Sequence, residues 1–260
     1  MISAVFLIAY LAFVVLMSVI VDNLLFLPIW IISGYIVGIV FVVLFLYLNF
    51  IWMAFTSPMH KMKTYIARSI SVWMMRFVLR IKLTVEGQEN IPLDGKVTTF
   101  ANHKCNVDPA PILSLMHRPT SFTPKSSVMK YPFLGKFLKY MGALPIDRSS
   151  TRNIAKSLVG AVKLAKEGMN FIVFPEGGIK SRIVDEMVDM RPGAYKIALK
   201  AQTDLCLLSI TEMREVKYNW PWKRTHVHVK VHPVIHYESI KDLNSTEVAQ
   251  KVFDIINKDL

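Results

Sequence analysis

Apolar residues dominate the beginning of the chain and later give way to alternating patterns. Residues 3–21 and 29–55 form two uncharged apolar runs, and each is long enough to cross a bilayer, which takes roughly 20 residues. Neither run has a polar face, and no basic segment precedes the first. A membrane helical hairpin over residues 1–58 is therefore favoured over a buried hairpin of a soluble protein and over a cleaved signal peptide. The pattern fits both a hairpin that spans the bilayer and one that sits partly in one leaflet.

Residues 59–82 predict a basic amphipathic segment, because Lys and Arg alternate there with large apolar side chains. Such a helix lies at a membrane interface with its cations near lipid phosphates, or packs on the following domain by its aromatic face. From residue 83 to 260, strand-like and helical patterns alternate, which predicts an α/β domain. The strand-like segments are KLTVEG, KVTTFA, TSFTPK, GALPID, NFIVF, DLCLLSI and HVHVKVHPVIH. The helical ones are DPAPILSLM, YPFLGKFLKYM, RNIAKSLVGAVKLAKEG, PGAYKIALKAQ and STEVAQKVFDIINKDL, the last with a Ser or Thr cap signal.

The distribution of charge predicts an orientation of the chain in the membrane and an anionic partner. The formal net charge is +12, and all 31 Lys and Arg residues follow residue 60. Cations directly after the second apolar run place the large domain and the N-terminus on the cytoplasmic face of a cell membrane. Anionic lipid headgroups are the expected polyanion, and no nucleic-acid-binding module is present. The 2 cysteines lie far apart without metal-ligand spacing, which fits a reducing compartment.

The stretch TFANHKCNVDPAP carries the first candidate chemistry, because His103 precedes Asp108 by five residues where a strand ends. A carboxylate on one ring nitrogen fixes the tautomer and direction of a histidine, so the other nitrogen can act as a base. Asp108 would also cap the helix that follows. A local turn is the alternative interpretation. Cys105 lies inside the motif, but a lone cysteine is more often a packed residue than a nucleophile.

Two further polar segments follow predicted strands. Asp147 and Arg148 come after GALPI, and Glu176, Lys180 and Arg182 come after NFIVF. Each alone is typical of a polar loop. Ligands of α/β sheets collect at the carboxyl ends of strands, and glycines with cations suit an anion. Together with His103 the segments predict a shared phosphate-binding site.

The motifs as a set resemble those of the glycerolipid acyltransferases, in particular the lysophosphatidic acid acyltransferase family. Asn102, His103 and Asp108 match its N-H-x-x-x-x-D block, while KSSVMKYPFLGKFLKYMGALPIDR and FPEGGIKS are similar to its second and third blocks. The resemblance covers about residues 83–212. It implies a mixed sheet flanked by helices after a membrane anchor, and acyl transfer to the sn-2 hydroxyl of lysophosphatidic acid. His103 would be the general base and Asp108 its orienting acid. The implied substrate-binding residues are Lys125, Arg148, Phe174, Pro175, Glu176, Gly177 and Lys180.

The resemblance implies no metal or redox cofactor, only acyl-CoA or acyl-carrier protein as co-substrate. Gly178 and Ile179 stand where the family's third block has Thr and Arg, so either Lys180 or Arg182 supplies the cation. Another lysophospholipid or glycerol 3-phosphate is the alternative acceptor, and a non-catalytic lipid-binding or scaffold protein is the alternative class. Four histidines of equal parity would share one strand face, exposed or metal-binding: His226, His228, His232 and His236.

Overall fold

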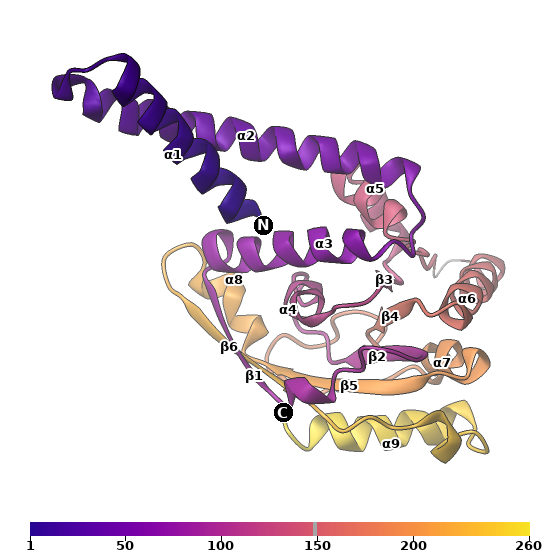
Figure 1. Cartoon of the computed structure of the whole chain (residues 1–260). Coiled ribbons are helices and arrows are strands. Elements are labelled where there is room, and N and C mark those ends of the chain that lie inside the picture. The colour runs from indigo at the N-terminus through magenta and orange to yellow at the C-terminus, as the bar shows by residue number, and fades with distance from the viewer. Residues whose placement is uncertain (148–149) are drawn as a thin grey trace. The chain divides into compact units, whose positions relative to one another are not determined.

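The computed structural model describes residues 1–147 and 150–260, and the chain divides into two compact units, Met1–Thr56 and Ser57–Leu260. The first unit consists mainly of helices α1 (Ile2–Ile20) and α2 (Leu27–Phe55), which pack against each other (Figure 1). Both are long and apolar enough to cross a membrane. Together they suggest membrane association, in the segment where the apolar pattern predicts a hairpin.

The two helices of the first unit approach each other closely at a pair of glycines. A Cβ atom built on Gly34 would lie 2.8 Å from Cγ2 of Val14, and one on Gly38 would lie 2.7 Å from the ring of Phe6. Glycines four residues apart on one helix permit this kind of contact between apolar helices. The hairpin is therefore held by close backbone approach and van der Waals packing.

One sheet organises the second unit. Within the described residues it has 6 strands in the order β1-β6-β5-β2-β4-β3. Their bounds are β1 Ile81–Glu86, β2 Val97–Ala101, β3 Thr120–Phe122, β4 Asn170–Val173, β5 Asp204–Thr211 and β6 Thr225–Val231. Strands β3, β4, β2 and β5 are mutually parallel, whereas β6 runs antiparallel to β5 and parallel to β1. The carboxyl ends of the four parallel strands therefore lie at the same edge as the amino ends of β1 and β6.

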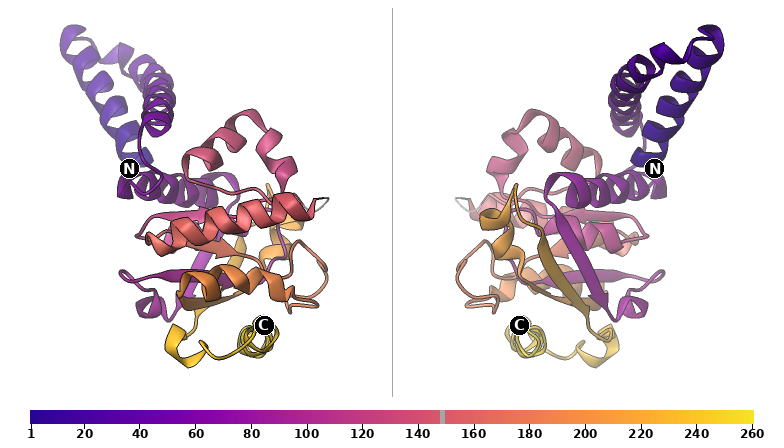
Figure 2. Two further views of the ribbon diagram at one scale, coloured as in Figure 1. Left: turned by 90° about the vertical axis from the view of Figure 1, so that its right-hand side faces the viewer. Right: turned by 90° about the vertical axis from the view of Figure 1, so that its left-hand side faces the viewer.

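Helices cover the sheet on both sides (Figures 1 and 2). Their bounds are α3 Lys61–Trp73, α4 Pro109–Leu115, α5 Pro132–Tyr140, α6 Thr151–Lys166, α7 Lys196–Ala201, α8 Val216–Asn219 and α9 Ser245–Asn257. One buried cluster joins α6, α7 and α9 to the strands, with Phe100, Phe171 and Leu205 among its fully buried members. Helices α3 and α4 pack together, and Figure 1 shows them on the other side of the sheet from α9. This mixed sheet with flanking helices is the predicted fold.

Helix α3 directs part of its charge inward. Lys63 is 1% exposed, and its ammonium group donates to the Tyr140 carbonyl at 2.8 Å. Arg68 donates through Nε to the Ser114 carbonyl at 2.6 Å, and its NH1 lies 2.8 Å from Nδ1 of His117. These two cations hold α3 on the domain rather than reaching toward lipid, so the packed interpretation describes this part of the helix.

Three local predictions were wrong. GALPID forms no strand among the described residues; Ile146 makes a single isolated bridge to Lys125. The cap of α9 is Asn244, not Ser or Thr, because its side chain accepts from the N–H groups of Thr246 and Glu247 while Glu247 bonds back in a capping box. The four histidines do not share one face, since β6 ends at Val231. Only His226 and His228 are exposed on it, whereas His232 is 4% exposed and bonds to Ser209.

Candidate active site

His103 and Asp108 form a hydrogen-bonded pair just past the carboxyl end of β2. Nδ1 of His103 lies 2.8 Å from Oδ2 of Asp108, and the two side chains are 17% and 1% exposed. An ionised carboxylate only accepts hydrogen bonds, so this geometry assigns the ring proton to Nδ1 and leaves a lone pair on Nε2. The contact between His103 and Asp108 that the spacing predicted is therefore present. The unprotonated Nε2 of His103 can accept a proton, as a general base must.

The carboxylate of Asp108 is fixed by the turn that precedes it. Oδ2 also accepts from the backbone N–H groups of Lys104 at 2.6 Å and Cys105 at 2.9 Å. Asp108 occupies the residue before α4, yet its side chain makes no capping bond to that helix. The prediction that it caps α4 is wrong, because the carboxylate points back to the turn. The turn therefore fixes the same carboxylate oxygen that contacts the His103 ring.

A buried ion pair between Lys104 and Glu176 supports the same turn. Glu176 accepts from the His103 backbone N–H through Oε1 at 2.8 Å and from Nζ of Lys104 through Oε2 at 2.9 Å. The side chains of Glu176 and Lys104 are 0% and 1% exposed. Opposite charges withstand such burial only when they are paired and hydrogen-bonded. Glu176 thus joins the third motif to the first, and its carboxylate has no exposed surface to offer a substrate.

The FPEG segment after β4 lines the other side of the histidine. The rings of Phe174 and His103 stack with centroids 4.2 Å apart and planes 18° apart. Gly177 has φ +69°, and a Cβ atom there would lie 2.6 Å from Cδ of Arg191. The Arg191 backbone N–H donates to the carbonyl of buried Pro175 at 2.8 Å. The segment therefore turns at Gly177 directly beneath Arg191, a cation that the motif pattern does not include.

The predicted cations are distributed unequally around the His103 turn. NH1 of Arg182 donates to the Lys104 carbonyl at 3.3 Å, so Arg182 contacts the turn. Lys180, 37% exposed, instead pairs with Asp189 at 3.4 Å. Lys125 is exposed at the start of the 3-10 helix Ser126–Lys130 in another loop. Arg148 lies outside the described residues. Between the two third-motif alternatives, Arg182 is the cation nearer to the catalytic candidate.

Asn102 holds the end of β2 in place. Its side-chain nitrogen donates to the carbonyls of Asp185 at 3.0 Å and Ile210 at 2.8 Å, and its oxygen accepts from the Ile210 N–H at 2.8 Å. The residue is 1% exposed. A buried amide that uses donors and acceptor together fixes its neighbours in one arrangement. Asn102 thereby ties β2 to the end of β5 next to His103.

The thiol of Cys105 is buried beside this turn. Cys105 is 8% exposed, and burial raises the pKa of its thiol, which disfavours the nucleophilic thiolate. Within residues 1–147 and 150–260, no group of three or more His, Cys, Asp or Glu side chains is arranged to hold a metal ion.

Comparisons with known proteins identify a family and several relatives to which this chain is similar. A family model described as acyltransferase matches residues 82–213. The chain is 29% identical over 196 residues to a 1-acyl-sn-glycerol-3-phosphate acyltransferase of Borreliella burgdorferi, covering 74% of this chain and 75% of that one. It is 24% identical over 185 residues to the protein of that name from Saccharomyces cerevisiae, covering 70% of this chain and 60% of the yeast protein.

A solved structure has the same fold. The crystal structure of the 1-acyl-sn-glycerophosphate acyltransferase of Thermotoga maritima superposes with a TM-score of 0.66 at 23% identity, covering 83% of this chain and 87% of that chain. The resemblance inferred from the motifs and the predicted fold are both confirmed.

Proposed function

The chain belongs to the acyltransferase family, and on that premise we propose that it moves a fatty acyl group from a thioester donor to the sn-2 hydroxyl of lysophosphatidic acid, giving phosphatidic acid. The acceptor is proposed from the names of the relatives, which are 1-acyl-sn-glycerol-3-phosphate acyltransferases. The observation that carries the chemistry is the 2.8 Å contact between His103 and buried Asp108.

In the proposed reaction His103 is the general base. Its Nε2 takes the proton of the acceptor hydroxyl as that oxygen attacks the thioester carbonyl carbon. The tetrahedral intermediate collapses, the carbon–sulfur bond breaks, and the imidazolium returns its proton to the leaving thiolate. Asp108 holds the ring in the Nδ1–H tautomer and stabilises the transient positive charge. No nucleophile of the protein is required, which agrees with the buried, protonated Cys105.

Two groups of residues support this base. Glu176 and Lys104 are positioning residues, because Glu176 accepts from the His103 backbone N–H and from the Lys104 ammonium, and both side chains are buried. Arg182 and Arg191 flank the turn and the FPEG segment and are the proposed partners of the acceptor's phosphate, since guanidinium groups match phosphate oxygens in pairs. Phe174, Pro175 and Gly177 shape the wall beside His103. Roles for Lys125, Arg148 and Lys180 in substrate binding remain predictions from the resemblance.

The proposal includes a bilayer, because both substrate and product are lipids. The helices α1 and α2 would anchor the chain, and the Lys and Arg residues that follow them support a cytoplasmic orientation of the domain by the positive-inside rule. Acyl-CoA or acyl-carrier protein then reaches the site from the aqueous side.

An acylation assay on the full chain in detergent micelles tests this function. Lysophosphatidic acid, glycerol 3-phosphate and lysophosphatidylcholine are each offered with acyl-CoA and with acyl-carrier protein as donor. We expect lysophosphatidic acid to be the preferred acceptor, and His103→Ala to reduce turnover by about 10³-fold or more, because the base is lost. Full activity of His103→Ala would contradict the mechanism. Activity confined to lysophosphatidylcholine would contradict the acceptor, and absence of any acyl transfer would favour the non-catalytic alternative.

A further inference from the structure

Two segments far apart in sequence form one surface of the second unit. The indole N–H of Trp220 donates to the Val78 carbonyl at 2.7 Å, and the Thr225 N–H donates to the Arg80 carbonyl at 3.1 Å. These bonds join the end of α3 and the π-helical turn after it, residues 73–80, to the end of α8 and the loop before β6, residues 217–224. We call residues 73–80 and 217–224 the aromatic–basic surface.

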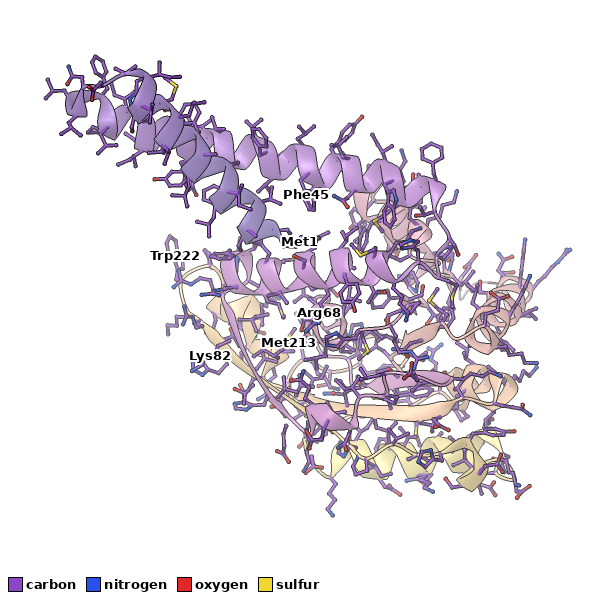
Figure 3. All side chains as sticks on the ribbon, in the orientation of Figure 1. Met1, Phe45, Arg68, Lys82, Met213 and Trp222 are labelled. Atoms are coloured by element: carbon purple, nitrogen blue, oxygen red, sulfur yellow. The ribbon has the colours of Figure 1, made fainter. Side chains whose placement is uncertain are left out.

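Large aromatic side chains on this surface are exposed. Figure 3 shows Trp222 at the outer end of the loop before β6. The exposed members are Trp73 at 38%, Phe77 at 56%, Tyr218 at 68%, Trp220 at 50% and Trp222 at 85%. The Trp73 and Phe77 rings lie with their centroids 5.9 Å apart. Exposed apolar patches mark interaction sites, and Trp and Tyr in particular concentrate where a bilayer meets water. The Trp220 N–H is already bonded to the protein, so its ring presents mainly apolar surface.

Cations accompany the aromatics. The guanidinium carbon of Arg76 lies 5.6 Å from the Phe77 ring centroid, and Nζ of Lys217 lies 5.7 Å from that of Tyr218. Arg80, Lys223 and Arg224 are exposed beside them. No Asp or Glu occurs between residues 61 and 85 or between 216 and 237. None of these five cations pairs with a carboxylate of the described chain. The complement of this surface is therefore anionic and at least partly apolar.

Sheet topology places the aromatic–basic surface on the functional side of the domain. Residues 73–80 lead into the amino end of β1, and residues 217–224 lead into the amino end of β6. Because β6 runs antiparallel to β5, these amino ends share one edge of the sheet with the carboxyl end of β2, which His103 follows. A planar partner at this edge faces both the surface and the catalytic turn.

We propose that the aromatic–basic surface binds the headgroup layer of an anionic bilayer, as a membrane contact separate from the apolar hairpin. Tryptophan and tyrosine rings enter the interface while the flanking Arg and Lys side chains meet lipid phosphates. A bilayer fits better than an acidic protein, because the same chain carries two helices that are apolar enough to enter a membrane. The inference rests on the proposed function only in that a lipid acceptor brings the domain to a bilayer.

The test measures the depth of residue 222 in the full chain reconstituted into vesicles. A nitroxide is attached to Trp222→Cys; Cys105 and Cys206 are buried, and the unsubstituted chain serves as the labelling blank. Collision rates with oxygen, which enters lipid, and with a nickel chelate, which stays in water, give the depth without any substrate. We expect the label to be shielded from nickel in vesicles of phosphatidylcholine with phosphatidylserine, and about threefold or more accessible in phosphatidylcholine alone.

A matched pair of charge variants separates this surface from general basicity. Lys217→Gln, Lys223→Gln and Arg224→Gln together should return the label to water in anionic vesicles, since each cation near such a surface contributes about fivefold to binding. Lys196→Gln, Lys200→Gln and Lys251→Gln remove the same charge from exposed positions on α7 and α9 and should leave the label buried. A label accessible to nickel in both vesicle types would overturn the proposal. So would shielding that follows protein concentration instead of lipid charge, which would assign the surface to a second copy.

The depth measurement and the acylation assay fail independently. An inactive chain whose label is shielded by anionic lipid would retain the surface and lose the proposed reaction. An active chain whose label stays in water would retain the reaction and lose the surface.

Discussion

The histidine–aspartate pairs His103–Asp108 and His236–Asp204 of the second unit are similar in geometry but differ in their surroundings. Nδ1 of His103 is 2.8 Å from Asp108, and Nδ1 of His236 is 3.0 Å from Asp204. Each carboxylate also accepts a backbone N–H, which for Asp204 comes from Tyr237 at 2.8 Å. By distance and bonding pattern the two pairs are nearly equivalent.

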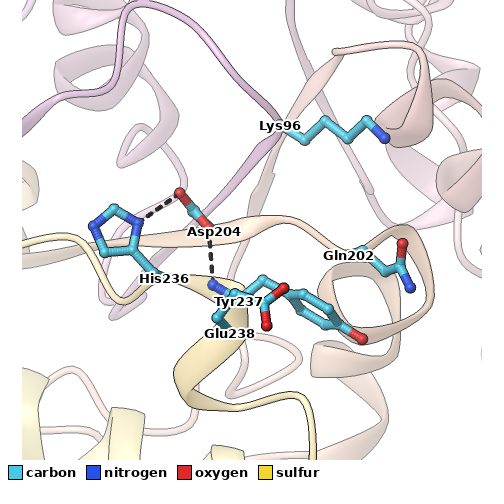
Figure 4. A pocket seen from close by; sticks show the side chains of 6 residues that line it. All are labelled: Lys96, Gln202, Asp204, His236, Tyr237 and Glu238. Carbon is cyan, nitrogen blue, oxygen red and sulfur yellow. Dashed lines mark hydrogen bonds and ion pairs between the residues drawn. The ribbon is translucent and has the colours of Figure 1, made fainter.

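Burial and position distinguish the pairs. The side chains of His236 and Asp204 are 75% and 36% exposed, against 17% and 1% for His103 and Asp108. Asp204 begins β5, so its pair lies at the edge opposite the carboxyl ends of the parallel strands. The pair lines a depression of about 560 Å³. Figure 4 shows no other ion pair among the six residues drawn there. Water competes for an exposed carboxylate, so the buried pair fixes its imidazole far more firmly.

Removing the negative charge of each pair gives the largest expected contrast. Asp108→Asn should lower kcat by about 10³- to 10⁴-fold, because the amide no longer stabilises the imidazolium or enforces the Nδ1–H tautomer. Asp204→Asn should change kcat less than about twofold. Steady-state acylation of lysophosphatidic acid in micelles measures both. Equal losses in the two variants would place catalysis elsewhere or in both pairs.

Disrupting the buried Lys104–Glu176 ion pair should give the next largest effect. This ion pair supports the turn at His103, and no such pair is drawn around His236 in Figure 4. Glu176→Gln leaves the Lys104 ammonium buried without its counter-charge, which costs about 3–5 kcal/mol of unfolding free energy. Because the turn that carries His103 is then held less rigidly, kcat should also fall by about 10- to 100-fold with little change in KM. Thermal unfolding and steady-state kinetics measure the two effects.

A rescue variant and a matched control test whether the effect of Glu176→Gln comes from the unpaired Lys104 charge. Lys104→Met combined with Glu176→Gln removes the stranded charge while keeping an acceptor for the His103 N–H, so most of the loss should be recovered. Glu186→Gln alters an exposed carboxylate and is the matched control. If Glu176→Gln behaved like Glu186→Gln, the pair would have no positioning role.

The smallest expected effect concerns the pH dependence of stability at His232. Its Nε2 lies 2.7 Å from Oγ of Ser209, which donates to the Ile256 carbonyl, so His232 is the donor and its Nδ1 faces Asp259 at 3.7 Å. Burial lowers the pKa of His232, although the Asp259 carboxylate opposes the shift and Lys230 adds to it. Neutral His232 therefore stabilises the fold above the ordinary histidine pKa of about 6.5, and this stability is lost as pH falls below it.

Unfolding temperatures between pH 7.5 and 5.5 test that sign. His232→Gln keeps a donor for Ser209 and should flatten the decline in unfolding temperature relative to the unsubstituted chain. His236→Gln, at the exposed pair, should leave the decline unchanged. Parallel curves for all three proteins would contradict the assignment.

Local sequence patterns were sufficient to predict many of the helices and strands and one side-chain contact of the candidate site. The apolar runs predicted α1 and α2, the alternating segments predicted β1, β2, β4, β5 and β6, and the five-residue spacing predicted the contact between His103 and Asp108. Each of these depends on residues close together in sequence, where periodicity and turn length determine geometry.

The sequence patterns did not predict contacts between residues that lie far apart along the chain. The sequence patterns assigned no role to Lys104, and only the fold reveals Glu176 beside it, 72 positions along the chain. Glu176, expected to bind substrate, has both oxygens taken by residues 103 and 104. Asp108 was expected to cap α4, but its Oδ2 instead accepts from the N–H groups of Lys104 and Cys105 in the turn before the helix. Arg191 lies over Gly177 although nothing in the motif indicated it.

If the proposed reaction takes place on a bilayer, the antiparallel placement of β6 also determines which acceptor concentration governs its rate. It brings the entrances of β1 and β6 to the edge where β2 ends, so on the proposed bilayer an acceptor reaches His103 by lateral diffusion within one leaflet. The rate then depends on the mole fraction of acceptor among the surrounding lipids, and not on its amount per volume of solution. Adding inert lipid would slow turnover, whereas diluting the same vesicles in buffer would leave each anchored molecule as fast as before.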